Sequence, residues 1–405
     1  MFQMSLIIQK FGGTSVSNSD SLKTVAKRIT ECKDAGNEVV VVVSAMGSST
    51  DELIELASEL SKEPSPREMD MLLSAGERIT MSLLAIHLNN LGYESFSLTG
   101  SQAGIITSSR HGRAEIENIT GERVKEGIEK GKIVIVAGFQ GVNKETREIT
   151  TLGRGGSDAT AVALAASLNA DRCEIYTDVD GVYSADPRIM KEAKLINEIT
   201  YDEMLEMASS GARVLMSRSV EFGRRYNVPI IVKSTFTNSE GTIVKEKTME
   251  EAIVRGVTHN DKETKFTLFG VPDQPGIAGK VFSPLSEGGI IVDMIVQNVS
   301  KDSKTDISFT APSDQKEEVM KILSELSNEL EAEGADSDIE VARVSIIGAG
   351  MKAESGVASK MFSILGKNKI NIGMISTSPI RISCVIPKND MNKAIEALHQ
   401  EFISK

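Results

Sequence analysis

The stretch Val39-Val40-Val41-Val42-Val43 decides the fold class of this chain. Five consecutive β-branched apolar residues favour a strand that is buried on both faces of a parallel sheet. Leu6 to Phe11 and Ile133 to Ala137 have the same character. Apolar residues at helical spacing lie between the first two strands, from about Asp20 to Gly36. Strands alternating with helices predict a three-layer α/β domain with a mostly parallel sheet.

Further predicted elements continue this alternation to about residue 232. Strands are expected at Phe96 to Leu98, Glu174 to Thr177 and Pro229 to Val232. Helices are expected at Asp51 to Leu60, Arg67 to Leu91, Ala159 to Leu168, Tyr201 to Ala208 and Arg213 to Tyr226. In such sheets ligands bind beyond the carboxyl ends of the strands, so the loops that follow the strands are the first candidates for a site.

The pattern changes after the polar run Lys245 to Glu251, where two segments resemble each other. Phe266 to Thr310 and Val344 to Ile386 carry matching residues 80 positions apart, such as Gly276 with Gly356. In each segment the predicted order is strand, glycine loop, helix, strand, strand, helix. This order is typical of a ferredoxin-like βαββαβ module. The predicted domains are therefore residues 1–248, residues 249–335 with a linker, a strand and the first module, and residues 336–405 with the second.

A glycine-rich stretch, Thr151-Leu152-Gly153-Arg154-Gly155-Gly156-Ser157-Asp158, precedes the predicted helix at Ala159. Glycines let a loop turn sharply and bring backbone N–H groups close to an anion. We expect Ser157 and Asp158 to cap the helix, whose N-terminus carries a partial positive charge. Arg154 adds a planar fork that suits a carboxylate or a phosphate. The stretch therefore predicts an anion site.

Lys10 closes the first apolar strand and is followed by two glycines. A buried ammonium group needs a partner, and near a transferred phosphate it would neutralise charge in the transition state. From strand position alone, a lysine that extends to solvent at the strand end is about as probable.

Other single signals are weak by themselves. Glu77 reads as an ordinary helical surface residue, and Asp178 and Asp180 read as turn formers. No histidine shows metal spacing or a companion for nucleophilic catalysis, and none is assigned a catalytic role; these are His87, His111, His259 and His399. No GxxxxGK[ST] motif is present, which excludes a Walker P-loop at the level of the motif.

Composition narrows the class of protein. The 405 residues carry a net charge of −12, which argues against a nucleic-acid or anionic-membrane surface. No apolar run approaches the roughly 18 residues of a membrane span, and no secretion signal is expected. The three cysteines lie far apart, so we expect neither structural zinc nor a disulfide framework, and a cytoplasmic location.

Four motifs taken together resemble the aspartate kinase family, and the likeness covers essentially the whole chain. They are Lys10-Phe-Gly-Gly-Thr-Ser-Val16, Ser74-Ala-Gly-Glu77, Thr151-Leu-Gly-Arg-Gly-Gly-Ser-Asp158 and Tyr176-Thr-Asp-Val-Asp-Gly-Val-Tyr-Ser-Ala-Asp-Pro-Arg188. The two C-terminal repeats resemble ACT domains. The resemblance implies an amino acid kinase fold and transfer of the γ-phosphate of Mg²⁺-bound ATP to the β-carboxylate of L-aspartate. It also implies that the strand near Ile253 to Val257 joins the sheet of the second repeat.

The resemblance also implies roles for individual residues. Lys10 would stabilise the transferred phosphoryl group, and Asp158 would organise its surroundings. Arg154 would bind the α-carboxylate of aspartate and Glu77 its ammonium group. The aspartate pocket would be completed by Ser44, Thr50, Gly155, Gly156 and Ser157. The nucleotide would contact Lys10, Phe11, Gly12, Gly13, Thr14, Ser15, Thr177, Asp178, Tyr183, Arg188 and Arg213. Arg213 stands where many members of the family have lysine.

ACT pairs in this family bind lysine, threonine or both, usually between two chains, so the resemblance implies feedback inhibition and a homo-oligomer. The implied effector residues are Asp273, Gly276, Ile277, Ala278, Asp293, Gln297, Asn298, Asn371, Ser376 and Thr377. Gly373 and Pro379 replace residues that are often acidic in the family. A missing carboxylate would weaken recognition of the effector's amine, so the sequence leaves open which amino acid inhibits.

Two other readings remain open. The first is an acyl-phosphate kinase of the same fold that acts on glutamate or a derivative, against which Glu77, Arg154 and the ACT pair count. The second is an amino-acid sensor with an inactive kinase domain. The presence of Lys10, Arg154 and Asp158 counts against it, because an inactive enzyme would have been free to lose them.

Overall fold

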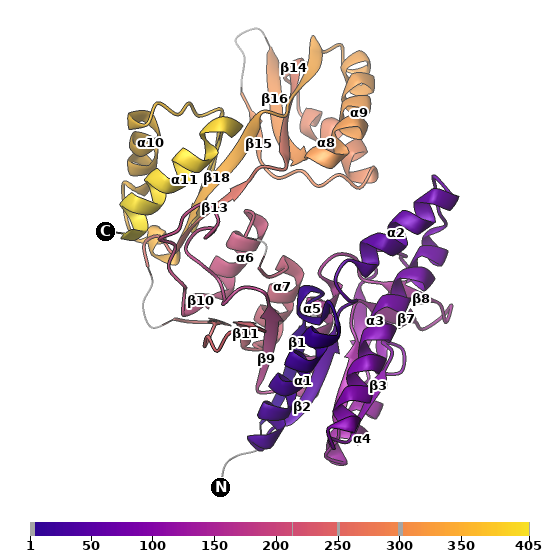
Figure 1. The fold of residues 1–405 in the computed structure, drawn as a ribbon. Coiled ribbons are helices and arrows are strands. Elements are labelled where there is room, and N and C mark those ends of the chain that lie inside the picture. Colours follow the sequence, from indigo (N-terminus) through magenta and orange to yellow (C-terminus); the bar gives the residue numbers. More distant parts are fainter. Residues whose placement is uncertain (1–4, 213, 249–251, 299–302, 405) are drawn as a thin grey trace. The chain divides into compact units, whose positions relative to one another are not determined.

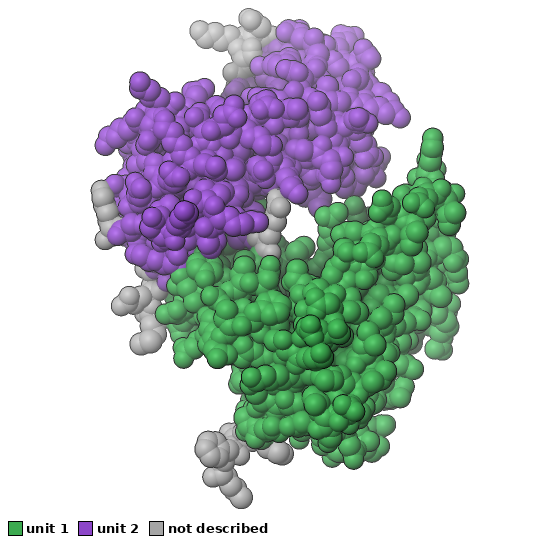
Figure 2. All heavy atoms as spheres, in the orientation of Figure 1, with its two compact units in different colours: residues 1–183, 195–209, 213–250 green, residues 184–194, 210–212, 251–405 purple. Residues whose placement is uncertain are grey.

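The computed structural model describes residues 5–212, 214–248, 252–298 and 303–404 (Figure 1). The chain forms two compact units (Figure 2). Unit 1 comprises residues 1–183, 195–209 and 213–250, and unit 2 comprises residues 184–194, 210–212 and 251–405. Among the helices that the structure describes, none is long and apolar enough to cross a membrane.

Unit 1 is built on an eight-stranded sheet in the order β10-β12-β11-β9-β1-β2-β6-β3. All neighbouring strands in this sheet run parallel except β11 and β12. Val39–Val43 lie in a central strand and have no exposed surface, so the predicted parallel sheet is confirmed. The strands are β1 (Leu6–Phe11), β2 (Glu38–Val43), β3 (Ser95–Leu98), β6 (Ile133–Ala137), β9 (Arg172–Thr177), β10 (Glu198–Thr200), β11 (Ile230–Ser234) and β12 (Thr242–Lys245).

Helices cover both faces of this sheet, as predicted. On one face, apolar residues of α1 and α3 pack against Val39, Val41 and Val43, and Figure 1 shows α1 lying along β1 and β2. On the other face, the alanine-rich α5 packs against β1, β2 and β9. The helices are α1 (Ser19–Asp34), α2 (Ser49–Leu60), α3 (Pro66–Asn90), α4 (Glu122–Glu129), α5 (Gly156–Leu168), α6 (Tyr201–Ser209) and α7 (Ser217–Tyr226).

Unit 1 also contains a second, four-stranded sheet that the sequence did not predict. Its order is β5-β4-β7-β8, and only β4 and β7 run parallel. Strands of three or four residues are too short to show an alternation of apolar and polar residues, so the sequence does not distinguish this region from a loop. The strands are β4 (Ile105–Thr107), β5 (Ile116–Ile119), β7 (Gln140–Asn143) and β8 (Ile149–Thr151). The last of them leads directly into the glycine-rich stretch.

Unit 2 contains the two predicted repeats. The first has the complete βαββαβ order, with a sheet ordered β15-β16-β14-β17. Its elements are β14 (Glu263–Pro272), α8 (Ile277–Glu287), β15 (Ile295–Gln297), β16 (Lys304–Pro312), α9 (Lys316–Glu329) and β17 (Gly334–Asp338). Gly276 and Gly356 both precede a helix with φ near +90°, which confirms their equivalence in the repeat.

Among the described residues of the second repeat, no strand follows the last helix, and a strand from earlier in the chain takes this place. β13 (Gly256–Asn260) pairs antiparallel with β18, at the edge where β17 lies in the first repeat. The expected strand near Ile253 to Val257 therefore joins this sheet, shifted by three residues, and the first repeat is inserted between β13 and β18. The other elements are β18 (Val341–Ile347), α10 (Val357–Lys367), β19 (Met374–Ser378), β20 (Arg381–Pro387) and α11 (Met391–His399).

A strap of unit 2, residues 184–194, comes from the part of the sequence between β9 and β10 of unit 1. Met190 is buried in the core of the second repeat, and Ser184 Oγ lies 2.8 Å from His399 Nε2. These compact units divide the chain differently from the predicted domains, whose boundaries at 248 and 335 stay a prediction.

Candidate active site

The candidate site lies at the carboxyl ends of three neighbouring strands, β1, β2 and β9. Backbone hydrogen bonds join the loops that follow them. Gly12 N–H donates to the Tyr176 carbonyl at 3.2 Å, and Ser44 N–H donates to the Phe11 carbonyl at 3.1 Å. Because the strands are adjacent and parallel, these loops meet at one edge of the sheet, where ligands bind in folds of this class.

Gly13 makes the closest approach between the loops after β1 and β2. A Cβ atom at this position would lie 3.1 Å from the Ala45 carbonyl oxygen and 3.2 Å from that of Gly47. Gly47 N–H donates to the Gly13 carbonyl at 3.0 Å. A side chain at position 13 would press on both carbonyl oxygens, so glycine lets the two loops pack this closely. Such a glycine loop also suits the close approach of a phosphate.

Lys10 and Asp158 form a buried ion pair. Lys10 Nζ lies 2.5 Å from Asp158 Oδ1, and the two residues are only 8% and 7% exposed. This pair explains how an ammonium group is tolerated at the end of an apolar strand, and it excludes the alternative of a lysine that extends to solvent. Two residues that lie 148 positions apart in the sequence therefore converge, as the proposal of a shared site required.

The prediction that Ser157 and Asp158 cap α5 is wrong. The N-cap is Gly155, with φ +70°, and no side chain makes the capping bond. Asp158 instead lies in the first turn of the helix, where its carboxylate pairs with Lys10. A Cβ atom at Gly155 would lie 2.0 Å from Met216 Cγ, so this position must be glycine. The negative charge of Asp158 remains favourable near the positive end of the helix dipole.

Glu77 is not the surface residue that its sequence suggests when it is read alone. It is 3% exposed on α3, and its Oε1 accepts a hydrogen bond from Ala45 N–H at 3.1 Å. Its Oε2 has no hydrogen-bond partner among the residues that the structure describes. Burial raises the pKa of Glu77 to about 7, and the charge of Lys10 opposes this rise. The site thus contains a buried carboxyl group with one oxygen available for a cationic ligand.

The glycine before Glu77 explains how the helix reaches the site. A Cβ atom at Gly76 would lie 2.7 Å from Ala45 Cβ, so only glycine lets α3 come this close to the loop after β2. The small residues of Ser74-Ala-Gly-Glu77 are therefore a packing signal as well as a family motif.

The remaining predicted substrate residues differ in exposure, and their place in the substrate pocket stays a prediction. Arg154 is exposed on the loop between Gly153 and Gly155, both of which have positive φ. Ser157 is buried in the first turn of α5. Ser44 directly follows β2, and Thr50 lies in the first turn of α2; both are half-buried.

Several predicted nucleotide residues have side chains with structural roles. Phe11 stacks on Tyr176 with ring centroids 4.7 Å apart, and both belong to the core. The Ser15 hydroxyl is fully buried and accepts a hydrogen bond from Thr235 Oγ1 at 2.7 Å. At Phe11 and Ser15, therefore, only backbone groups are suited to a phosphate. Gly12 and Thr14 lie in the same turn, with Thr14 exposed at the start of a short 3₁₀ helix.

The other predicted nucleotide residues follow β9. Thr177 Oγ1 donates to the exposed Asp178 at 2.9 Å, and the Tyr183 hydroxyl lies 3.5 Å from Asp180. Arg188 belongs to unit 2, where its guanidinium pairs with Asp186 at 2.7 Å. Arg213 lies outside the described residues.

Among the predicted effector residues, Asp293 is already paired within its own chain. Its carboxylate forms an ion pair with Arg343, which also pairs with Glu263 at 2.7 Å. Arg343 is 1% exposed, so this pair joins the two repeats from the inside. Ile277 is likewise part of the core of the first repeat.

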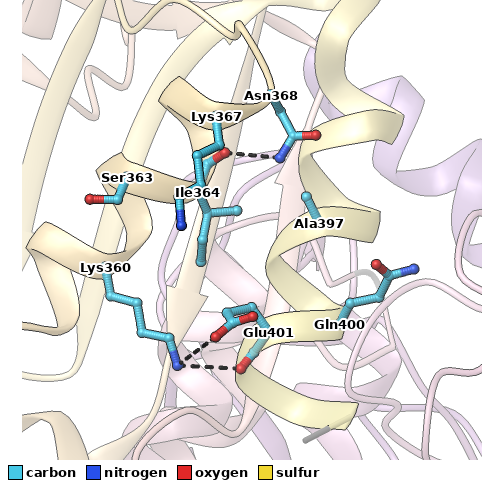
Figure 3. A pocket seen from close by; sticks show the side chains of 8 residues that line it. All are labelled: Lys360, Ser363, Ile364, Lys367, Asn368, Ala397, Gln400 and Glu401. Atoms are coloured by element: carbon cyan, nitrogen blue, oxygen red, sulfur yellow. Dashed lines mark hydrogen bonds and ion pairs between the residues drawn. The ribbon is translucent and has the colours of Figure 1, made fainter.

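The other effector candidates occupy loops and strand edges of unit 2. Asp273, Gly276 and Ala278 lie at the turn into α8, Gln297 and Asn298 at the end of β15, and Asn371, Ser376 and Thr377 before and within β19. None of them lines the pocket between α10 and α11 in Figure 3. There Lys360 Nζ lies 3.3 Å from Glu401 Oε1.

One buried acidic residue near the site was missed by the sequence reading. Asp70 is fully buried on α3. It lies on the same face of the helix as Glu77, two turns before it. A spacing of seven residues was its only signal, and that spacing is common in any buried helix. In the part of the chain that is described, no group of three or more His, Cys, Asp or Glu side chains is arranged to hold a metal ion.

Comparisons with known proteins identify relatives over nearly the whole chain. The amino acid kinase family model matches residues 5–234, and the ACT domain model matches residues 267–326 and 344–402. The aspartokinases of Mycolicibacterium smegmatis and Corynebacterium glutamicum are each 50% identical to this chain, over 98% of it and 96% of their own length. The structure of Escherichia coli aspartokinase III in complex with aspartate and ADP superposes with a TM-score of 0.84 at 26% identity, covering 99% of this chain and all of that one.

The chain therefore belongs to the amino acid kinases that carry ACT domains. Within them it belongs to the aspartokinase family, and it is an ATP-dependent kinase.

Proposed function

We propose that this protein transfers the γ-phosphate of Mg²⁺-bound ATP to the β-carboxylate of L-aspartate and forms 4-phospho-L-aspartate. This reaction opens the route to lysine, threonine and methionine. The observation that carries the proposal is the buried Lys10–Asp158 pair beside the buried Glu77, whose Oε2 is unpartnered among the described atoms. A cytoplasmic location, expected from the cysteines, is part of the proposal.

Phosphoryl transfer to a carboxylate needs charge neutralisation and alignment. The acceptor carries no proton that a general base would have to remove, so the site needs no poised histidine. Lys10 would neutralise charge on the transferred group, and the backbone of Gly12 and Gly13 would approach the phosphates. Asp158 would hold Lys10 in place. Mg²⁺ would be bound mainly through the phosphates, as is usual for this ion.

Aspartate also brings an α-carboxylate and an ammonium group, which need partners of opposite charge. Glu77 would accept the ammonium group, because its Oε2 lacks a partner among the described residues. Arg154 would bind the α-carboxylate with its planar fork. Ser44, Thr50 and Ser157 would line the pocket. Thr177, Asp178, Tyr183, Arg188 and Arg213 are proposed for the nucleotide side.

An assay that traps the acyl phosphate with hydroxylamine tests this function directly. With ATP and Mg²⁺ present, we expect hydroxamate formation with L-aspartate and at most a few per cent of that rate with L-glutamate. Comparable rates on both substrates would favour the broader acyl-phosphate kinase. No hydroxamate from either, with lysine or threonine still bound, would favour an amino-acid sensor with an inactive kinase domain.

We also propose feedback regulation by lysine, threonine or both at the ACT repeats, in a homo-oligomer formed through them. Because Asp293 is held by Arg343, an effector ammonium group at this position would have to share or displace that pair. We expect titration of lysine, threonine and their mixture to inhibit the kinase at least several-fold. A flat response to all three titrations would contradict this regulation.

A further inference from the structure

Asp70 makes an unusually full set of contacts for a residue outside the predicted site. It is fully buried, and its two carboxylate oxygens serve three neighbours. Thr151 Oγ1 donates to Oδ1 at 2.5 Å, Gly112 N–H donates at 3.1 Å to Oδ1, and His111 Nδ1 lies 2.6 Å from Oδ2. A buried carboxylate is costly unless its oxygens are satisfied, so these contacts fix both the acid and its partners.

These partners belong to two segments of unit 1 that are separate in sequence; α3 also packs against β8, and Asp70 adds a polar contact to both segments. Thr151 is the last residue of β8 and the first of the glycine-rich stretch. His111 and Gly112 lie in the loop between β4 and β5. Asp70 therefore ties the helix that carries Glu77 to the start of the loop that carries Arg154.

The two loops are also joined to each other. Ala114 N–H donates to the Thr151 carbonyl at 2.9 Å. Arg218 donates to the carbonyls of Leu152 and Ala114, at 3.1 and 3.0 Å. A Cβ atom at Gly153 would lie 3.0 Å from the Gly112 carbonyl oxygen. The first half of the glycine-rich stretch is thus held from three sides, up to the residue before Arg154.

Arg154 itself has no such support from its neighbours in sequence. It is exposed, and the residues on either side of it are glycines with positive φ, which restrict the backbone less than other residues would. The position of its guanidinium then depends on where the loop is anchored, and the bond from Thr151 to Asp70 is one of these anchors.

We propose that Asp70 is a positioning residue for aspartate recognition: through Thr151 it sets the path of the loop that presents Arg154 to the α-carboxylate of the substrate. This inference rests on the proposed function, and it deepens it by assigning a role to a residue that touches no substrate. Glu77 and Arg154, the proposed partners of the two ends of aspartate, are then held in register by one helix.

Asp70→Asn and Thr151→Val test the proposal together. The Asp70 carboxylate has two acceptor oxygens for its three neighbours, and asparagine keeps only one of them. Valine at position 151 replaces only the hydroxyl. We expect each variant to raise the aspartate KM roughly tenfold, with kcat and the ATP KM changed less than about threefold. Thr80→Val is the matched control, because Thr80 is a fully buried threonine of α3 whose hydroxyl donates within the same helix, to the Gly76 carbonyl at 3.2 Å.

A double-mutant cycle with Arg154→Ala separates positioning from general damage. If Asp70 acts through Arg154, Asp70→Asn raises the aspartate KM less than about twofold in the Arg154→Ala background. An undiminished effect in that background would overturn the proposal, as would an aspartate KM within twofold of the unmodified protein in both Asp70→Asn and Thr151→Val. If Asp70→Asn does not fold, Thr151→Val decides.

Hydrogen exchange gives a readout that does not depend on activity. Asp70→Asn should speed amide exchange in residues 151–156 and leave residues 160–168 unchanged. Unchanged exchange in residues 151–156 would overturn the positioning role even in an active enzyme. An unmodified protein that forms no aspartyl hydroxamate would instead refute the proposed function, while the exchange result would still decide whether Asp70 anchors the loop.

Discussion

Replacing Lys10 by alanine is expected to lower kcat/KM for ATP at least about 10³-fold, in the range found when a positioned cation is removed from phosphoryl transfer. Lys10 is the buried cation at the carboxyl end of β1, beside the glycine loop suited to phosphates. Aspartate binding should change much less, because Arg154 and Glu77 remain. The measurement is steady-state hydroxamate formation with each substrate varied in turn.

A second variant separates catalysis from stability. Lys10→Ala leaves the buried Asp158 carboxylate without its partner, and breaking such a pair costs about 3–5 kcal/mol of folding free energy. Lys10→Met combined with Asp158→Asn removes both charges and should regain most of that stability without regaining turnover. Near-normal turnover in either variant would refute the role of Lys10.

The strands of the main sheet could be predicted because their sequences carry the signal of burial. Val39–Val43 can hardly form anything but a buried strand, and the structure shows them without exposed surface. The repeat could be predicted because matching residues recur 80 positions apart. In the structure, Gly276 and Gly356 have the same positive φ before a helix. The strand supplied by β13 was expected only from the family likeness, because strand pairing over 80 residues leaves no local pattern.

Those parts of the site that depend on neighbouring residues in the sequence, such as glycine turns, could be predicted. The pairs formed by residues far apart in the sequence could not be predicted in this way. The glycines after β1 and before α5 indicated tight turns, and the structure places Gly13 and Gly155 where a Cβ atom would meet neighbouring atoms; their approach to an anion stays a prediction. The capping prediction was wrong because the partner of Asp158 comes from a distant strand. The pairing of Asp293 with Arg343 had the same origin: 50 residues separate the two, and nothing in either neighbourhood indicates the other.

The pKa of Glu77 predicts a pH dependence for aspartate use. The substrate's ammonium group needs an ionised Glu77, and burial raises the pKa of this carboxyl group to about 7. We therefore expect kcat/KM for aspartate to rise with pH up to about 7 and to level off above it. Glu77→Gln should flatten this profile and lower kcat/KM for aspartate at pH 8 by about 2–3 kcal/mol, or roughly 30- to 150-fold.

The same shift predicts that Glu77→Gln stabilises the protein. The pKa of Glu77 is higher in the folded state, about 7, than its ordinary value of 4.5, so its contribution to stability is complete below pH 4.5 and is lost as the pH rises through 7. The loss amounts to about 3 kcal/mol at pH 8, from 1.36 kcal/mol for each pKa unit. Glutamine keeps the shape of the side chain and the bond from Ala45 N–H, and carries no charge.

Thermal or denaturant unfolding at pH 5 and pH 8 measures this difference. Glu77→Gln should lie within about 1 kcal/mol of the unmodified protein at pH 5 and exceed its free energy of unfolding by clearly more at pH 8. If the variant is more stable and binds aspartate more weakly, Glu77 is a binding group whose charge lowers the free energy of unfolding. Lower stability at pH 8, or a normal kcat/KM for aspartate, would show that the carboxylate serves the packing of α3 against the loop after β2 and not the substrate.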